Sequence, residues 1–205
     1  MQPPLCCLYI SNWTRGIRGG NNCVLTVGYN LRFLPSLQKF KDLIDKNFVG
    51  DLYSVRSEVG QYLPNWRKTD YRKTVSAQKI LGGGVLLELS HELDYMRWIF
   101  GEVESVQAQL SRQSQLDIDV EDTAHIILKF KENKNNTNLI ASLNLDFIRH
   151  DKVRMCHVIG DKGSLRWNGL TGDIDLFEVD KSEWNNIYKY KADQDESYKN
   201  EWRHF

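Results

Sequence analysis

The sequence predicts an α+β fold, in which an open and predominantly antiparallel sheet carries helices packed on one face. Two observations predict it. Helical periodicity is confined to the first half of the chain, over residues 35–44 and 85–100. Alternation of apolar and polar residues, typical of strands, fills residues 123–179, where the links are short and rich in glycine and aspartate. Short links join antiparallel neighbours, so these strands are expected to form a meander.

The chain divides into an irregular leader, residues 1–22, and one domain, residues 23–205. The leader holds two prolines and three glycines without sustained periodicity. A chain of 205 residues with 41% hydrophobic content can bury a sizeable core, which argues against global disorder. Residues 195–205 resemble a helix that is just beginning, so we expect the domain to be clipped at its C-terminal end.

The domain is expected to open with a strand and an amphipathic helix. Residues 24–27 form a short β-branched run that predicts a strand ending at Gly28. A helix of about three turns is predicted from Pro35, closed by Asn47 and Gly50. Its buried face is one stripe of large apolar residues, Leu37, Phe40, Leu43 and Ile44.

The middle of the chain is expected to hold a strand, a long excursion and a buried helix. Residues 52–63 are strand-like, whereas residues 64–80 are polar, aromatic and basic without a clear period. Loops of that length usually carry function. Residues 85–100, opened by a triple glycine and stopped by Gly101, are hydrophobic on nearly every side, which predicts a helix buried between layers. Further strands are expected at residues 124–130, 139–147, 153–159, 164–167 and 174–179.

Charge and composition argue against several classes of protein. Twenty-seven basic and 27 acidic residues give no net charge, which disfavours a nucleic-acid binder. A basic patch around Arg67, Lys68, Arg72 and Lys73 is the one feature that would support such a role. No stretch is long enough to cross a bilayer, so no membrane role is expected. The four cysteines lack the spacing of a disulfide framework, which favours a reducing cytoplasm.

The segment from Gly82 to Gly101 carries the residues best suited to chemistry. On one helix, Glu88, His91 and Tyr95 share a face, and a carboxylate one turn from an imidazole can tune its protonation. Proton transfer and a structural role in the core are both open for this histidine. The triple glycine permits either a close approach by a ligand or a tight packing turn. No metal site is expected, because the HExxH pattern would need histidine at position 95.

Five strings, taken in order, resemble the C-terminal domain of the Gfo/Idh/MocA oxidoreductase family. They are VGYNLRFLP (27–35), YLPNWRKTDYR (62–72), GGGVLLELSHELDYMRWIFG (82–101), DIDVEDTAHIILKF (117–130) and IGDKGSLRW (159–167). The resemblance implies an N-terminal Rossmann domain that binds NAD or NADP. It also implies hydride transfer at a hydroxyl- or keto-bearing carbon of a sugar or cyclitol, and an open sheet that often mediates homo-oligomerisation.

The resemblance assigns roles to single residues. His91 would handle the proton of the substrate hydroxyl, and Glu88 would be the preceding acid, where many members have aspartate. The substrate cleft is expected to include Tyr29, Asn30 and Arg32, with surface-turn roles equally open. Aromatic and guanidinium groups of the long excursion suit stacking and hydrogen bonding to a sugar, or serve to anchor the loop. They are Tyr62, Trp66, Arg67 and Tyr71.

The departures from the family pattern decide the functional prediction. No GxGxxG phosphate loop occurs in the sequence, and residues 1–22 contain no lysine where the family's EKP motif is expected. We therefore expect a truncated or split oxidoreductase whose chain binds no NAD or NADP alone, with a separate Rossmann-domain chain as one possible partner. The alternative is a non-catalytic carbohydrate-binding or assembly module.

Overall fold

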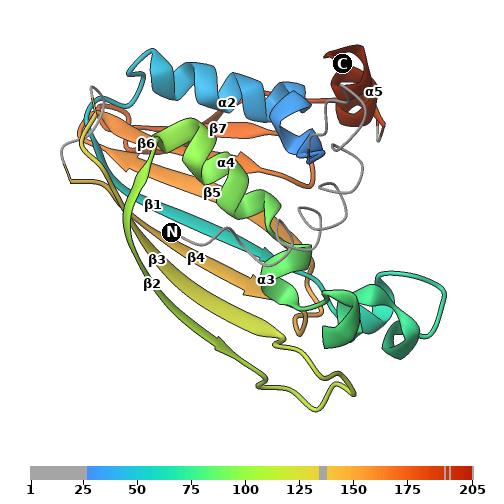
Figure 1. The fold of residues 1–205 in the computed structure, drawn as a ribbon. Coiled ribbons are helices and arrows are strands. Elements are labelled where there is room, and N and C mark those ends of the chain that lie inside the picture. Colours follow the sequence, from blue (N-terminus) through green and yellow to red (C-terminus); the bar gives the residue numbers. More distant parts are fainter. Residues whose placement is uncertain (1–26, 134–137, 192, 194, 205) are drawn as a thin grey trace, which may run out of the picture.

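The protein is built as one eight-stranded sheet with helices on one face (Figure 1), as expected for an α+β fold. The computed structural model describes residues 27–133, 138–191, 193 and 195–204. The predicted leader and residues 24–26 of the first predicted strand lie outside the described residues.

The strands follow the spatial order β2-β3-β4-β1-β5-β6-β7-β8. Every neighbouring pair is antiparallel except β1 and β4, which are parallel. The meander is thus confirmed within β2–β4 and β5–β8, while β1 separates these two runs. Strands β2 and β8 were not predicted. The bounds are β1 Leu52–Gly60, β2 Val103–Ser111, β3 Thr123–Phe130, β4 Ile140–Asp146, β5 Val153–Gly160, β6 Gly163–Asn168, β7 Ile174–Glu178 and β8 Glu183–Tyr188.

Helix α2 (Pro35–Asp45) has the predicted buried stripe. Leu37, Phe40, Leu43 and Ile44 are all buried against the sheet. Proline suits the first turn because it donates no N–H there, and Pro35 occupies that position. The chain leaves the helix through Asn47 and Gly50, both with positive φ.

The single buried helix predicted after the triple glycine is wrong, because two helices occupy the segment. They are the one-turn α3 (Val85–Glu88) and α4 (His91–Phe100), with Leu89 and Ser90 between them. The start of α3 is fixed by Glu121, whose carbonyl oxygen accepts the N–H of Val85 and whose carboxylate accepts the N–H of Leu86. Because α3 is attached to Glu121, it does not continue into α4. The second helix therefore begins at His91, after the break at Leu89 and Ser90.

The long excursion folds as a series of single 3-10 turns rather than as an extended loop. They are η2 (Leu63–Asn65), η3 (Tyr71–Lys73), η4 (Val75–Ala77) and η5 (Lys79–Leu81). Another turn, η1 (Asn30–Phe33), precedes α2. The helix expected at the end of the sequence is α5 (Glu196–His204), which packs against η1 (Figure 1). No helix of the described segments is long and apolar enough to span a bilayer.

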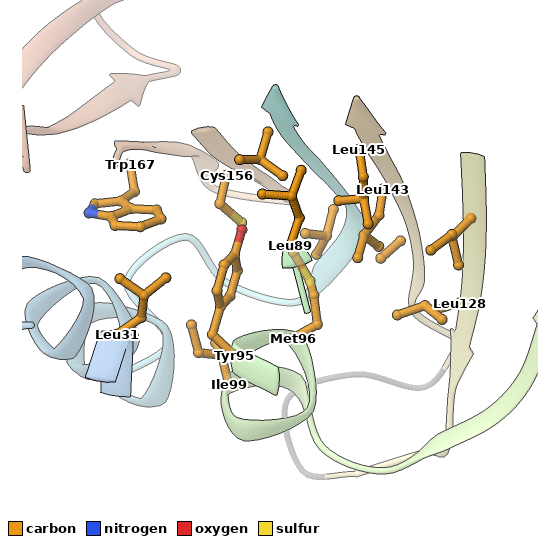
Figure 2. Close-up of a cluster of buried hydrophobic side chains, with 14 of the residues drawn as sticks. Leu31, Leu89, Tyr95, Met96, Ile99, Leu128, Leu143, Leu145, Cys156 and Trp167 are labelled. Carbon is orange, nitrogen blue, oxygen red and sulfur yellow. The ribbon is translucent and has the colours of Figure 1, made fainter. Parts of the chain in front are cut away.

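The core lies between the helices and the inner face of the sheet (Figure 2). Trp167 is fully buried, with its ring against those of Phe40 and Tyr95, and its indole N–H donates to the hydroxyl of Ser36 at 3.1 Å. Tyr95 rises from α4 toward the sheet, where its hydroxyl lies 2.7 Å from that of Ser57. These contacts tie α2 and α4 to the sheet.

The packing around Trp167 predicts that Trp167→Ala lowers the free energy of unfolding by about 3–5 kcal/mol, because it removes a large side chain from a closed core. Urea unfolding followed by circular dichroism measures the change. The matched control is Trp202→Ala on α5, whose side chain is 80% exposed. That control should change stability by less than about 0.5 kcal/mol. Equal effects of the two substitutions would contradict the assignment of the core.

Candidate functional site

A cleft of about 530 Å³ opens where the break before α4 faces the start of β5. Its walls come from η1, the end of β1, the turn between β6 and β7, and the segment that leads into α5. Polar and charged side chains line much of it. They are Asn30, Gln61, Glu88, His91, Lys152, Arg154, Thr171, Tyr190, Asp193, Ser197 and Tyr198.

His91 stands at the first position of α4 and faces this cleft. Its Nδ1 is buried and has no hydrogen-bond partner among the described residues. The ring of Tyr29 meets the imidazole edge-on, with 5.6 Å between the ring centroids. Burial and the nearby Arg154 guanidinium lower the pKa of His91 to about 4, while Asp94 acts in the opposite direction. The imidazole is therefore neutral near pH 7 and able to accept a proton.

Glu88 also lines the cleft, at the end of α3. Its carboxylate accepts a hydrogen bond of 2.5 Å from the hydroxyl of Ser76, so the excursion and α3 are joined there. The charged groups that act on His91 are Arg154 and Asp94. Tyr95, predicted to share a face with Glu88 and His91, points into the core instead, because it belongs to a different helix from Glu88.

The residues predicted around η1 lie beside the cleft. Asn30 lines it and donates its amide N–H to the hydroxyl of Ser197, at 2.9 Å. Arg32 binds both carboxylate oxygens of Asp94, at 2.8 and 2.7 Å. That bond holds η1 against α4 and keeps Tyr29 beside the imidazole.

Asp94 and Arg97 lie one turn apart on α4, and this spacing predicts a pair between them that the structure does not contain. Asp94 binds Arg32, while the guanidinium of Arg97 lies 2.8 Å from Glu102. Arg97 is exposed and Asp94 faces η1, so each meets a partner outside α4.

Of the four excursion residues predicted to bind the substrate, the structure places one in the cleft and three outside it. Trp66 lines the cleft, and its indole N–H donates to the carbonyl of Gln61 at 3.0 Å. Tyr62, Arg67 and Tyr71 do not line it. The ring of Tyr62 stacks on that of His150 with 4.1 Å between centroids, Arg67 is exposed, and the Tyr71 hydroxyl accepts the N–H of Asp117 at 3.2 Å. Tyr71 therefore anchors the loop through its hydroxyl, which is the alternative role expected for these side chains.

Sequence reasoning missed an ion pair beneath the cleft. Arg154 of β5 lines the cleft, and its Nε lies 2.8 Å from Oε1 of Glu92, which is fully buried on α4. The Nε hydrogen is not aligned for a hydrogen bond, so the attraction between the charges holds the pair together. Burial raises the pKa of Glu92, and Arg154 opposes that rise. The sequence contained one indication of this pair, because Glu92 follows His91 on an otherwise apolar helix face and a buried carboxylate needs a partner.

The triple glycine serves packing. A Cβ at position 83 would lie 2.1 Å from the carbonyl oxygen of Val75, and one at position 84 would lie 2.5 Å from the carboxylate of Glu121. These close approaches explain why side chains are absent at both positions. Of the two roles open for the triple glycine, a tight packing turn and a close approach to a ligand, the structure supports the packing turn.

The described residues do not fit the phosphates of a dinucleotide. A Rossmann cradle needs a strand, a glycine-rich turn and a helix joined to a second parallel strand. Within the described ranges, the parallel pair is β1 and β4, and the helix after the glycines, α3, has four residues. No group of three or more potential ligands in the described segments could hold a metal ion.

The fold and cleft together define an α+β domain that presents a neutral histidine to a polar cleft. The chain belongs to the Gfo/Idh/MocA family, since the model of the GFO/IDH/MocA C-terminal domain matches residues 37–166. It is 26% identical over 164 residues to Oxidoreductase P35 of Formosa agariphila, covering 75% of this chain and 46% of that protein. It is 30% identical over 153 residues to an uncharacterized oxidoreductase of Synechocystis sp., covering 67% of this chain and 38% of the relative.

Solved structures share the fold. Levoglucosan dehydrogenase in complex with NADH superposes with a TM-score of 0.68 at 21% identity, covering 83% of this chain and 48% of that one. The WlbA dehydrogenase of Bordetella pertussis, in complex with NADH and UDP-GlcNAcA, gives a TM-score of 0.62 at 23% identity, covering 88% and 50%. The chain thus spans about half the length of these structures and less than half of the two curated relatives.

The lowered pKa of His91 predicts a loss of stability in mild acid. As the pH falls below 6.5, the unfolded chain takes up a proton, whereas the folded protein does so only near pH 4. Between pH 7.5 and pH 5, His91 should therefore reduce the free energy of unfolding by about 2 kcal/mol.

Urea unfolding of the natural protein and of His91→Gln at both pH values measures this term. Other titrating groups are common to the two proteins and cancel in the difference. A His91→Gln variant that loses as much stability in acid as the natural protein would refute the assignment.

Proposed function

We propose that this chain is the substrate-binding and assembly half of an NAD(P)-dependent sugar or cyclitol oxidoreductase. The observation that carries the proposal is the neutral imidazole of His91, whose Nδ1 has no partner among the described residues, at the wall of a polar cleft. Family membership and the dehydrogenase structures that share the fold support the reaction class.

The chain's own part in the reaction is to bind the sugar and move a proton. His91 accepts the proton of the substrate hydroxyl in oxidation and returns it in reduction. Trp66, Asn30 and Glu88 line the same cleft and supply one aromatic surface and polar partners for hydroxyl groups. Tyr29 and Arg32 position the imidazole through the contact with α4.

The chain is inactive alone in this proposal. The described residues offer no cradle for dinucleotide phosphates, so the nicotinamide is brought by a Rossmann domain that these residues do not include. Tyr62, Arg67 and Tyr71 do not line the cleft, so this proposal gives them no contact with the sugar. We place the protein in the cytoplasm, since Cys156 is a free, buried thiol whose pKa is raised by burial.

The outer face of the sheet is the proposed assembly surface. Ile127 of β3 and Ile140 of β4 are 47% and 45% exposed on strands that no helix of the described segments covers from that side (Figure 1). Trp184 of β8 lies on the same face, opposite Phe177. Exposed apolar side chains spread over a flat sheet favour association with a second copy.

The competing function is a carbohydrate-binding or assembly module without chemistry. The sheet, the cleft and its polar lining would serve both functions equally well. Only the proton-transfer role of His91 separates them, because a binding module has no need for a neutral base at the wall of the cleft.

Complementation tests the proposed function. The chain is mixed with a Rossmann domain taken from a family member, and NAD(P)-dependent oxidation of sugars and cyclitols is measured. Activity is expected only in the mixture, and His91→Gln should lower kcat by about 10²- to 10⁴-fold. The matched control, His125→Gln, removes an exposed imidazole from the outer face, where its Nδ1 meets the Asn144 side chain at 2.7 Å, and should leave kcat within twofold.

Titration of the chain alone with NADH and NADPH completes this test. Energy transfer from its six tryptophans to reduced nicotinamide should not saturate. Saturable transfer would reveal a cofactor site and refute dependence on a partner. Sugar binding without activity in any mixture would favour the binding module.

Assembly through the sheet predicts a dimer or larger species at micromolar concentration in sedimentation velocity. Ile127→Lys should shift the protein toward the monomer, because it places a charge in the proposed contact. The control is Ile80→Lys on η5, where the side chain is 79% exposed and lies off the sheet. A natural protein that sediments as a clean monomer would contradict the assembly role.

A further inference from the structure

The buried carboxylate of Glu92 holds Arg154 on the side away from the cleft. Glu92 is fully buried in the first turn of α4, and its Oε1 lies 2.8 Å from Nε of Arg154. A buried carboxylate needs a cation close by, so the ion pair fixes the place of the guanidinium. The fold thereby prepares Arg154 at the base of the cleft before any ligand arrives.

The turn between β6 and β7 is shaped around the same side chain. A Cβ at position 169 would lie 2.4 Å from the Cγ of Arg154, so only glycine leaves room for its aliphatic stem. The N–H of Gly169 also donates to the carbonyl of Arg154, at 2.7 Å. Glu92 on one side and Gly169 on the other hold the stem between them.

The far end of the guanidinium remains available. A guanidinium has five N–H donors, and within the described part of the chain Arg154 makes no side-chain hydrogen bond. Its side chain is 23% exposed and lines the cleft, so donors reach the space where a substrate would lie.

Lys152 adds a second cation to the same wall. It stands two residues before Arg154, at the start of β5, and both side chains line the cleft. Lys152 is exposed and has no ion-pair partner among the residues that the structure describes.

The two carboxylates that line the cleft are already engaged by other groups. Glu88 accepts the hydroxyl of Ser76, and Asp193 pairs with Lys199 at 2.8 Å. Asp193 is thus neutralised by Lys199, whereas Glu88 keeps its charge, and the cationic donors left without a partner among the described residues are Lys152 and the outer nitrogens of Arg154.

We propose that Arg154 and Lys152 bind an anionic substituent of the substrate, which makes the preferred substrates acidic sugars rather than neutral ones. The inference rests on the proposed function and narrows its substrate class. A planar guanidinium donates two parallel hydrogen bonds to a carboxylate, and a phosphate offers the same pair of oxygens. Arg154 and His91 line the same cleft, so the anion and the reacting hydroxyl belong to one small molecule.

The test measures dissociation constants of the full chain by NMR titration. The probes are D-glucuronate, D-glucose and D-glucose 6-phosphate, which compare a carboxylate, a neutral group and a phosphate on one ring. An anionic probe should bind at least about tenfold more tightly than glucose, as expected for hydrogen bonds to charged groups. The anion that binds more tightly shows whether the site prefers a carboxylate or a phosphate.

Two variants and one control locate the effect. Arg154→Met alone would leave Glu92 buried and unpaired, so the double variant Glu92→Leu/Arg154→Met removes both charges and keeps the core apolar. Lys152→Met changes only an exposed side chain and cannot disturb the core. Each should reduce the preference for the anion, by about tenfold in the double variant and by about threefold in Lys152→Met, with glucose affinity within twofold. Lys46→Met on α2, whose side chain is 67% exposed and outside the cleft, is the charge-matched control and should change nothing.

The outcomes separate this inference from the proposed function. Equal binding of glucose and both anions, or a preference unaffected by all cleft variants, overturns the acidic-sugar inference while a sugar-binding half stands. Binding of none of the probes by the folded chain overturns the proposed function, and the inference falls with it.

Discussion

The position of β1 in the middle of the sheet is the constraint on which the rest of the structure depends. β1 pairs in parallel with β4 on one side and antiparallel with β5 on the other. A parallel pair needs a connection that crosses from one end of the sheet to the other, and this one carries the excursion, α3 and α4 over the inner face. His91 consequently stands above the place where β1 ends and β5 begins, so the cleft is a product of the topology.

Burial gives the site its chemistry. The imidazole of His91 lies in a poorly hydrated position beside a cation, and both factors favour the neutral form. The carboxylate of Asp94 opposes them, yet its two oxygens are occupied by Arg32. The same bond holds η1 and Tyr29 in place. A contact that looks like a simple surface ion pair therefore holds the groups that surround the candidate base.

Local patterns predicted the elements better than their arrangement. The stripe of α2 and the alternation of β3 to β7 follow from periods of 3.6 and 2, which single segments contain. The break at Leu89 and Ser90 was invisible because it comes from the attachment of α3 to Glu121, far along the chain. The insertion of β1 depends on strand pairing, which no local period encodes.

The site residues also fall into those that the sequence predicted and those that only the tertiary structure brings together. His91, Glu88, Asn30 and Trp66 were predicted and do line the cleft, since a motif or a family resemblance identified each. Arg154 and Lys152 were missed. Alternation along β5 places both on one face, but only the tertiary structure puts α4 and Glu92 over that face.

The contact between α5 and η1 has a consequence for how the cleft is assembled. Asn30 and Ser197 are hydrogen-bonded across 167 positions of sequence, and the side-chain amide of Asn200 donates to the carbonyl of Phe33 at 3.2 Å. Contacts so distant in sequence are costly in loop entropy and slow to form. The formation of this wall of the cleft therefore depends on the sheet between those positions being in place.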